Sequence, residues 1–89
     1  MASVKNETFP AHLASVLRYH RKQSDLTRIE LARLSGVGKT AIFDIEHAKH
    51  SIRLDTLFKI LTVLNISLDF KSPLMQNYHQ HSKTKTESS

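Results

Sequence analysis

Apolar residues recur at helical spacing through most of the chain's first two thirds. One helix is predicted over about residues 10–23, where Leu13, Val16 and Leu17 share one face and the proline at its start fits a first turn. Leucine and phenylalanine repeat in the same way over residues 54–64, which predicts a longer amphipathic helix. Two helices of this kind, without an obvious strand between them, favour an all-α domain.

A capping box lies between these two helices. Thr27 and Glu30 are spaced so that each side chain can accept a hydrogen bond from the other residue's backbone N–H. This signal predicts a short helix over about residues 28–35. Gly36 follows it at a point where the chain must turn sharply, and glycine adopts a positive φ readily.

A second short helix is predicted over about residues 39–47, with Ile42 and Ile45 on its inner face. Two helices that cross steeply need a small side chain at their contact, and Ala32 occupies that place in the preceding helix. A tight turn at Gly36 completes the pair. This geometry leaves the N-terminal part of the second helix projecting outward.

The period of the pattern changes from helix to strand after Asn65, a residue that often ends a helix in the left-handed conformation. Ile66, Leu68 and Phe70 alternate with polar residues up to Pro73, which predicts a strand over about residues 66–71. A single strand is not stable by itself, and no second one is evident in this sequence. We therefore expect it to pair with its copy in a second subunit, through these three apolar residues.

The two ends of the sequence are polar and lack a periodic apolar face. Residues 1–8 are expected to form a flexible lead and residues 73–89 a disordered tail, which leaves one domain over residues 9–72.

The 89-residue chain carries a net charge of +5 and contains no cysteine. The charge suits a polyanion such as nucleic acid, or an anionic membrane surface. Eight of the 13 lysines and arginines lie between Arg18 and Arg53, with four acids in the same stretch. The lack of cysteine excludes disulfides and thiolate chemistry. A small secreted domain often needs a disulfide, so we expect a cytoplasmic protein. No apolar run is long enough to span a bilayer, and we expect no membrane partner.

Enzyme chemistry finds no support in the sequence. The segment from Gly36 to Thr40 is similar to the end of a phosphate-binding loop, but Arg33 stands where that loop needs a glycine and no strand precedes it. The six histidines show no metal-ligand spacing. We therefore expect no catalytic residue, no metal and no cofactor.

The stretch from about Leu17 to Leu68 resembles the Cro/repressor (Xre-type) helix-turn-helix family. The matching residues are Leu26, Thr27, Glu30, Leu31, Ala32, Gly36, Val37, Ile42, Ile45, Glu46, Lys49 and Leu54 to Lys59. The resemblance implies a five-helix, lambda-repressor-like DNA-binding domain, with the C-terminal strand pairing across a homodimer. Within the family, the short length, the alternating segment and the sequence from Gly36 to Thr40 look like HipB-type antitoxin-repressors.

The resemblance also implies roles for individual positions. Those matching the base-facing positions are Arg28, Lys39, Thr40, Phe43 and Asp44; those matching the phosphate-facing edge are Thr27, Gly38, His47, Lys49, Ser51 and Arg53. Arg21 and Glu46 match a structural pair that joins the first helix to the recognition helix. Side-chain chemistry agrees for most of them, since arginine and lysine donate to guanine O6 and N7, and an aspartate can accept from cytosine N4.

Three positions depart from the family's usual residues. Phe43 is unusual on an outward-leaning position, where it either touches a thymine methyl or packs against a neighbour. Arginine at position 28 replaces the frequent glutamine, which changes what this position can read. Ala48 stands where a glycine commonly ends the recognition helix, and it would be strained there if a positive φ is needed.

The resemblance implies a bacterial, nucleoid-associated transcriptional repressor that binds a palindromic operator. It further implies the antitoxin of a HipA-like kinase toxin, acting on its own promoter. The alternative from the sequence is a protein-binding inhibitor of the toxin kinase, for which DNA binding is secondary and the strand and tail carry the function.

Overall fold

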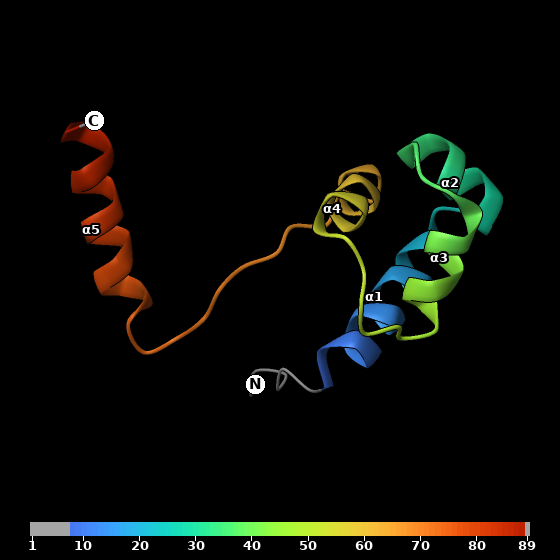
Figure 1. Cartoon of the computed structure of the whole chain (residues 1–89), viewed down its shortest axis with the longest axis horizontal. Coiled ribbons are helices and arrows are strands. Elements are labelled where there is room, and N and C mark those ends of the chain that lie inside the picture. The colour runs from blue at the N-terminus through green and yellow to red at the C-terminus, as the bar shows by residue number, and fades with distance from the viewer. Residues whose placement is uncertain (1–7, 89) are drawn as a thin grey trace.

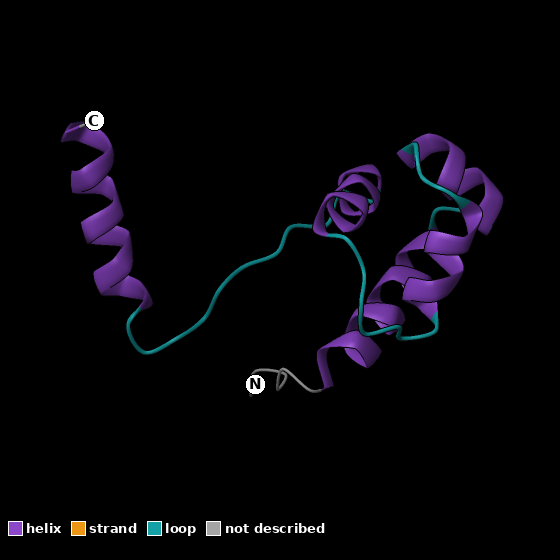
Figure 2. Ribbon diagram, viewed as in Figure 1, coloured by secondary structure: helices purple, strands orange, loops and turns teal. Residues whose placement is uncertain are grey.

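The computed structural model describes residues 8–88, with side chains through residue 82. This part of the chain is all-α and contains no strand (Figures 1 and 2). Its helices are α1 (Phe9–Gln23), α2 (Arg28–Ser35), α3 (Lys39–Glu46), α4 (Leu54–Val63) and α5 (Met75–Ser88). The first seven residues of the expected flexible lead lie outside the described residues.

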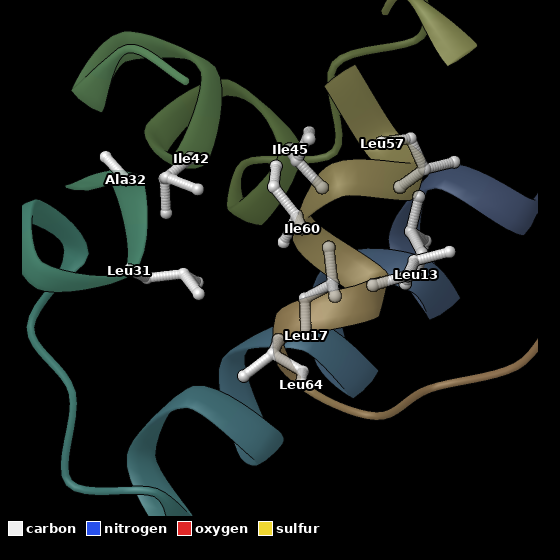
Figure 3. Packing of buried hydrophobic residues seen from close by; sticks show 10 residues of the cluster. Leu13, Leu17, Leu31, Ala32, Ile42, Ile45, Leu57, Ile60 and Leu64 are labelled. Atoms are coloured by element: carbon white, nitrogen blue, oxygen red, sulfur yellow. The ribbon is translucent and has the colours of Figure 1, made fainter. Parts of the chain in front are cut away.

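Helices α1 to α4 pack around one aliphatic core (Figure 3). Its members are Leu13, Leu17, Leu31, Ala32, Ile42, Ile45, Leu57, Ile60, Leu61 and Leu64. Burying each of the larger side chains contributes about 1.5–3 kcal/mol, so this core is the main source of stability. All four predicted helices contribute apolar residues to it, but Leu54 and Phe58, which belong to the pattern over residues 54–64, are exposed.

The capping box at the start of α2 is confirmed. The Thr27 hydroxyl accepts from the Glu30 N–H at 3.1 Å, and the Glu30 carboxylate accepts from the Thr27 N–H at 2.8 Å. The backbone hydrogen bond from Thr27 lowers the pKa of Glu30, because it stabilises the charged form. This cap fixes the place where α2 begins, and with it the direction of Arg28, the helix's first residue.

The turn between α2 and α3 has the predicted geometry. Gly36 ends α2 at a φ of 73°, and the Val37 N–H donates to the Ala32 carbonyl at 3.0 Å. Ala32, Ile42 and Ile45 are all buried at the contact, as the spacing predicted. The two helices therefore lock together and leave the first turn of α3 in solvent.

Among residues 8–88, three residues other than glycine adopt a positive φ. Ala48 does so at 61°, so the positive φ considered for this position is present, and Asn65 at 57° ends α4 as predicted. Asp25, also at 57°, lies in the turn after α1. The sequence indicated a break there but not its left-handed conformation.

The C-terminal third differs from the prediction. Residues 66–71 form no strand in this single chain, because the only partner expected for them was a second copy. Ile66 packs against the core, and its N–H donates to the Leu61 carbonyl at 2.9 Å. Leu68 and Phe70 are exposed.

The tail expected to be disordered carries α5 instead, and this helix stands away from the other four (Figure 1). The number of helices agrees with the prediction of a five-helix domain, but their arrangement does not. Four helices pack together, and the fifth follows an extended segment. Helix α5 is polar on all sides, so hydrophobic periodicity gave no signal for it.

Candidate nucleic-acid interface

An open groove runs between the start of α2 and the first half of α3. We call it the α2–α3 groove, and its lining residues are Arg21, Thr27, Arg28, Ile29, Lys39, Thr40 and Phe43. Four of the five residues predicted to face bases are among them. The sequence did not single out Ile29, whose exposed side chain supplies apolar surface at the groove.

Lys39 and Thr40 occupy the first turn of α3 and are exposed. Neither side chain makes a hydrogen bond or ion pair within the described part of the chain. Gly38 precedes them as the N-cap and provides no side-chain cap, so the start of α3 is open to solvent. These groups are free to donate to an external acceptor.

The carboxylate of Glu46 joins three helices. Arg21 on α1 donates to it from Nε at 2.6 Å and from Nη2 at 3.1 Å, while Arg28 on α2 donates from Nε at 2.9 Å. Arg21 also donates to the Leu26 carbonyl at 2.9 Å. The expected pair of Arg21 and Glu46 is thus in contact, and Arg28 adds a third member that the sequence did not indicate.

Burial by itself would raise the pKa of the Glu46 carboxyl, because it disfavours the charged form. The hydrogen bonds from Arg21 and Arg28 outweigh this effect and hold the pKa of Glu46 below its ordinary value. The carboxylate is therefore charged at neutral pH, and it compensates one of the two guanidinium charges beside it.

Two aromatic side chains stack on the exposed face of α3. The Phe43 and His47 rings lie 3.8 Å apart between centroids with an angle of 22° between their planes, and His47 Nδ1 lies 2.7 Å from the Phe43 carbonyl oxygen. The Arg28 guanidinium carbon lies 5.6 Å from the centroid of the Phe43 ring. The Phe43 ring thus lies near both the Arg28 guanidinium and the His47 imidazole, on the groove side of α3.

The remaining predicted contact residues are not among those that line the groove. Asp44 on α3 forms an ion pair with Lys49 at 3.4 Å, so its carboxylate already faces a cation. Arg53 pairs with Asp55 through two hydrogen bonds, of 3.0 and 3.1 Å, at the start of α4. Ser51 is exposed in the loop between them. The structure therefore places Arg28 and Lys39 at the groove, whereas Lys49 and Arg53 are each paired with an acid outside its lining.

Comparison with known proteins agrees with this geometry. Residues 17–71 match the HTH_3 helix-turn-helix family. The chain belongs to this family. An uncharacterised HTH-type transcriptional regulator, y4mF, from Sinorhizobium fredii is 33% identical over 64 residues, which cover 72% of this chain and 84% of the relative. Antitoxin HipB from Escherichia coli K12 is 32% identical over 68 residues, covering 76% of this chain and 77% of the relative.

Solved structures of helix-turn-helix proteins share the fold. A chain in the structure of a HipA-HipB-O2-O3 complex has a TM-score of 0.68 and 27% identity, and the match covers 82% of this chain and 99% of that one. A HipB-O4 20mer complex gives a TM-score of 0.67 at 27% identity, with 82% and 99% covered.

The described part of the chain contains neither a membrane-spanning helix nor a metal-binding cluster. None of the helices in residues 8–88 is long and apolar enough to cross a membrane. Over the same residues, no three histidine, aspartate or glutamate side chains gather in a way that could hold a metal ion.

Two contacts in this helix-turn-helix unit were not predicted from the sequence. One joins residues far apart in the sequence, and the other joins near neighbours. Arg28 and Glu46 are 18 positions apart, and no local pattern signals their approach. The pair of Arg53 and Asp55 could have been found, because the two lie two positions apart at the start of a predicted helix.

Proposed function

We propose that this chain is a sequence-specific transcriptional repressor that inserts the N-terminal half of α3 into the major groove of double-stranded DNA. One observation carries the proposal: Lys39 and Thr40 are exposed and unengaged at the first turn of α3, in the same groove as Arg28. In a helix-turn-helix unit this is the end of the recognition helix that reaches base edges.

The chemistry of the groove fits base recognition. Lys39 and Arg28 can donate to guanine O6 and N7, and the Thr40 methyl can pack on a thymine methyl. Phe43 offers apolar surface for the same purpose. Asp44 is the weakest of the proposed base contacts, since Lys49 already pairs with its carboxylate.

The surrounding residues are proposed to contact phosphates and to set the register on the duplex. They are Thr27, Gly38, His47, Lys49, Ser51 and Arg53. Such contacts release condensed counterions, so the affinity should fall steeply as salt is raised.

The repressor is proposed to act as a homodimer through residues 66–71. Beyond Ile66, whose N–H bonds to the Leu61 carbonyl, the backbone of residues 67–71 makes no backbone–backbone hydrogen bond within the described part of the chain. Leu68 and Phe70 lie exposed on this segment. Pairing this segment with its copy would cover both. It would also place two α3 helices on successive major grooves of a palindrome, about 34 Å apart.

The proposed biological setting is a toxin–antitoxin operon in bacteria, in which the repressor acts on its own promoter in the cytoplasm, associated with the nucleoid. Support comes from the relative named Antitoxin HipB and from the related chain of the HipA-HipB-O2-O3 complex. A HipA-like kinase toxin is accordingly the proposed protein partner. The alternative is that inhibition of this toxin is the chief function and DNA binding is secondary. It is favoured by α5, which stands apart from α2 and α3 in Figure 1 and so leaves a separate surface for a protein partner.

The Lys39→Ala substitution tests the proposal. An operator selected from random duplexes by the wild-type protein should lose about 1–3 kcal/mol of preference over scrambled DNA, because a base contact is removed. Gel shifts on both duplexes measure this loss. Lys59→Ala on α4, which removes the same charge away from the groove, should leave the preference unchanged.

Equal losses on the two duplexes would assign Lys39 to a phosphate instead. Co-expression with the toxin separates the two functions: if Lys39→Ala abolishes repression while growth is still protected, both activities exist and are separable. If the wild-type protein protects growth but selects no duplex, the inhibitor alternative stands and the repressor is rejected.

A further inference from the structure

The buried carboxylate of Glu46 does more than pair two helices, since it also contacts the arginine that departs from the family pattern. We propose that Glu46 is a positioning residue for base recognition, which holds Arg28 so that its two terminal amino groups read a guanine. This inference rests on the proposed DNA-binding function and deepens it.

The anchor is rigid. The Glu46 side chain is only 1% exposed, and that of Arg21 9%. Oε2 accepts from Arg21 Nε, and Oε1 accepts from both Arg21 Nη2 and Arg28 Nε. With Arg21 also bonded to the Leu26 carbonyl, the carboxylate cannot turn away without leaving a buried guanidinium unpaired. Arg28 is thus tethered at one defined atom.

The tether leaves one edge of the Arg28 guanidinium available. Nε is engaged, while Nη1 and Nη2 have no partner among the described residues. The Arg28 side chain keeps 34% of its surface exposed, on the same groove as Lys39 and Thr40. Guanine offers O6 and N7 side by side, and a fork of two parallel N–H groups matches them. Because Nε is already bonded to Glu46, the two terminal amino groups, Nη1 and Nη2, are the pair left to bind guanine.

Two neighbours favour a base over a phosphate. The Phe43 ring, 5.6 Å from the Arg28 guanidinium carbon, restricts the plane of the guanidinium on one side. Glu46 offsets part of the positive charge, so the attraction of Arg28 to a phosphate is weaker than that of a solitary arginine. The O6 and N7 pair of guanine, which matches the spacing of the two amino groups, is then a better partner than a phosphate.

The experiment compares sequence preferences of full-length variants. Wild-type protein selects an operator from random duplexes, and each base pair of that operator is then varied in binding assays. Arg28→Lys keeps the charge but cannot present a fork; Arg28→Gln restores the residue frequent in the family. Both should lower the guanine preference at one symmetric pair of positions by about tenfold or more, since a bidentate contact is lost. Arg33→Lys, an exposed arginine on the same helix, is the matched control and should change no position.

Glu46→Gln tests the positioning role. In the wild-type background it should weaken the guanine preference at the Arg28 position, and in the Arg28→Gln background it should change no preference further. A purely structural role would weaken binding evenly at all positions in both backgrounds, and this result would overturn the proposal. Circular dichroism verifies folding. If Glu46→Gln is unfolded, Glu46→Asp takes its place, because it keeps the negative charge while drawing the carboxylate back from Arg28 Nε.

The failures are distinguishable. If the wild-type protein selects no duplex at all, the proposed function falls and this inference falls with it. If it selects an operator whose every position is insensitive to Arg28→Lys and Arg28→Gln, the inference alone is wrong.

Discussion

At the scale of single residues, Ala48 is the position where one substitution should stabilise the protein. Its φ of 61° costs an L-residue about 1–2 kcal/mol, whereas glycine tolerates this conformation. Ala48→Gly should therefore raise the free energy of unfolding by about 1 kcal/mol, after the entropy that glycine loses on folding. Urea denaturation measures it. Ala41→Gly, the same chemical change inside α3, should lower stability by about 0.5–1 kcal/mol; if both variants lose stability, Ala48 is not strained.

Residue-level predictions from the sequence succeeded where the signal was local. Thr27 with Glu30, Gly36 and Ala48 depend on conformations that a few neighbouring residues determine. The link between Arg28 and Glu46 depends on how α2 and α3 pack, and this was beyond reach of any local pattern.

At the scale of elements, Glu46 should make the packing of α1, α2 and α3 sensitive to acid. Its pKa is lower in the folded protein than in the unfolded chain, so its stabilisation is complete above the ordinary value of 4.5 and is lost as the pH falls through the folded value. Glu46→Gln should lose about 3 kcal/mol at pH 7, the lower end for a broken buried pair, because the amide oxygen can still accept.

Urea denaturation between pH 7 and pH 3 checks this behaviour. The variant should lose less stability than the wild type over the acid part of the range, and the gap between the two curves should narrow as the pH falls. Glu30 and Asp55, whose pKa values are also lowered, are present in both proteins and cancel in the difference. Parallel curves would show that Glu46 does not carry the effect.

Elements with an apolar stripe were predictable and the polar one was not. Helices α1 to α4 were predicted to within a few residues because each buries periodic side chains. Helix α5 has no such stripe, and only the absence of glycine and proline over residues 75–88 was compatible with a helix.

At the scale of the whole molecule, Phe70→Asp should convert the proposed dimer into a monomer. Phe70 is 79% exposed in the single chain and lies on the segment proposed to pair, so a charge there would be buried on pairing. Sedimentation equilibrium measures the dissociation constant, which should rise about tenfold or more. Leu74→Asp, at a side chain 70% exposed just beyond Pro73, is the control and should leave it unchanged. A Phe70→Asp protein that remains dimeric would place the interface elsewhere.

The proposed dimer could not be derived in full from the sequence or from the structure of a single chain. Alternation of Ile66, Leu68 and Phe70 indicates a strand, but a strand exists only through hydrogen bonds to a neighbour. In one copy, Ile66 packs on the core and the two residues beyond it remain exposed.

The sharing of one carboxylate by Arg21 and Arg28 has a consequence for how new operator specificities could arise. Lys39 and Thr40 can be exchanged without disturbing the interior, because no other described side chain depends on them. A change at position 28 instead removes a donor from the Glu46 carboxylate, which links α1, α2 and α3. Directed evolution toward new DNA targets should therefore begin at positions 39 and 40, and reach position 28 only in scaffolds made more robust beforehand.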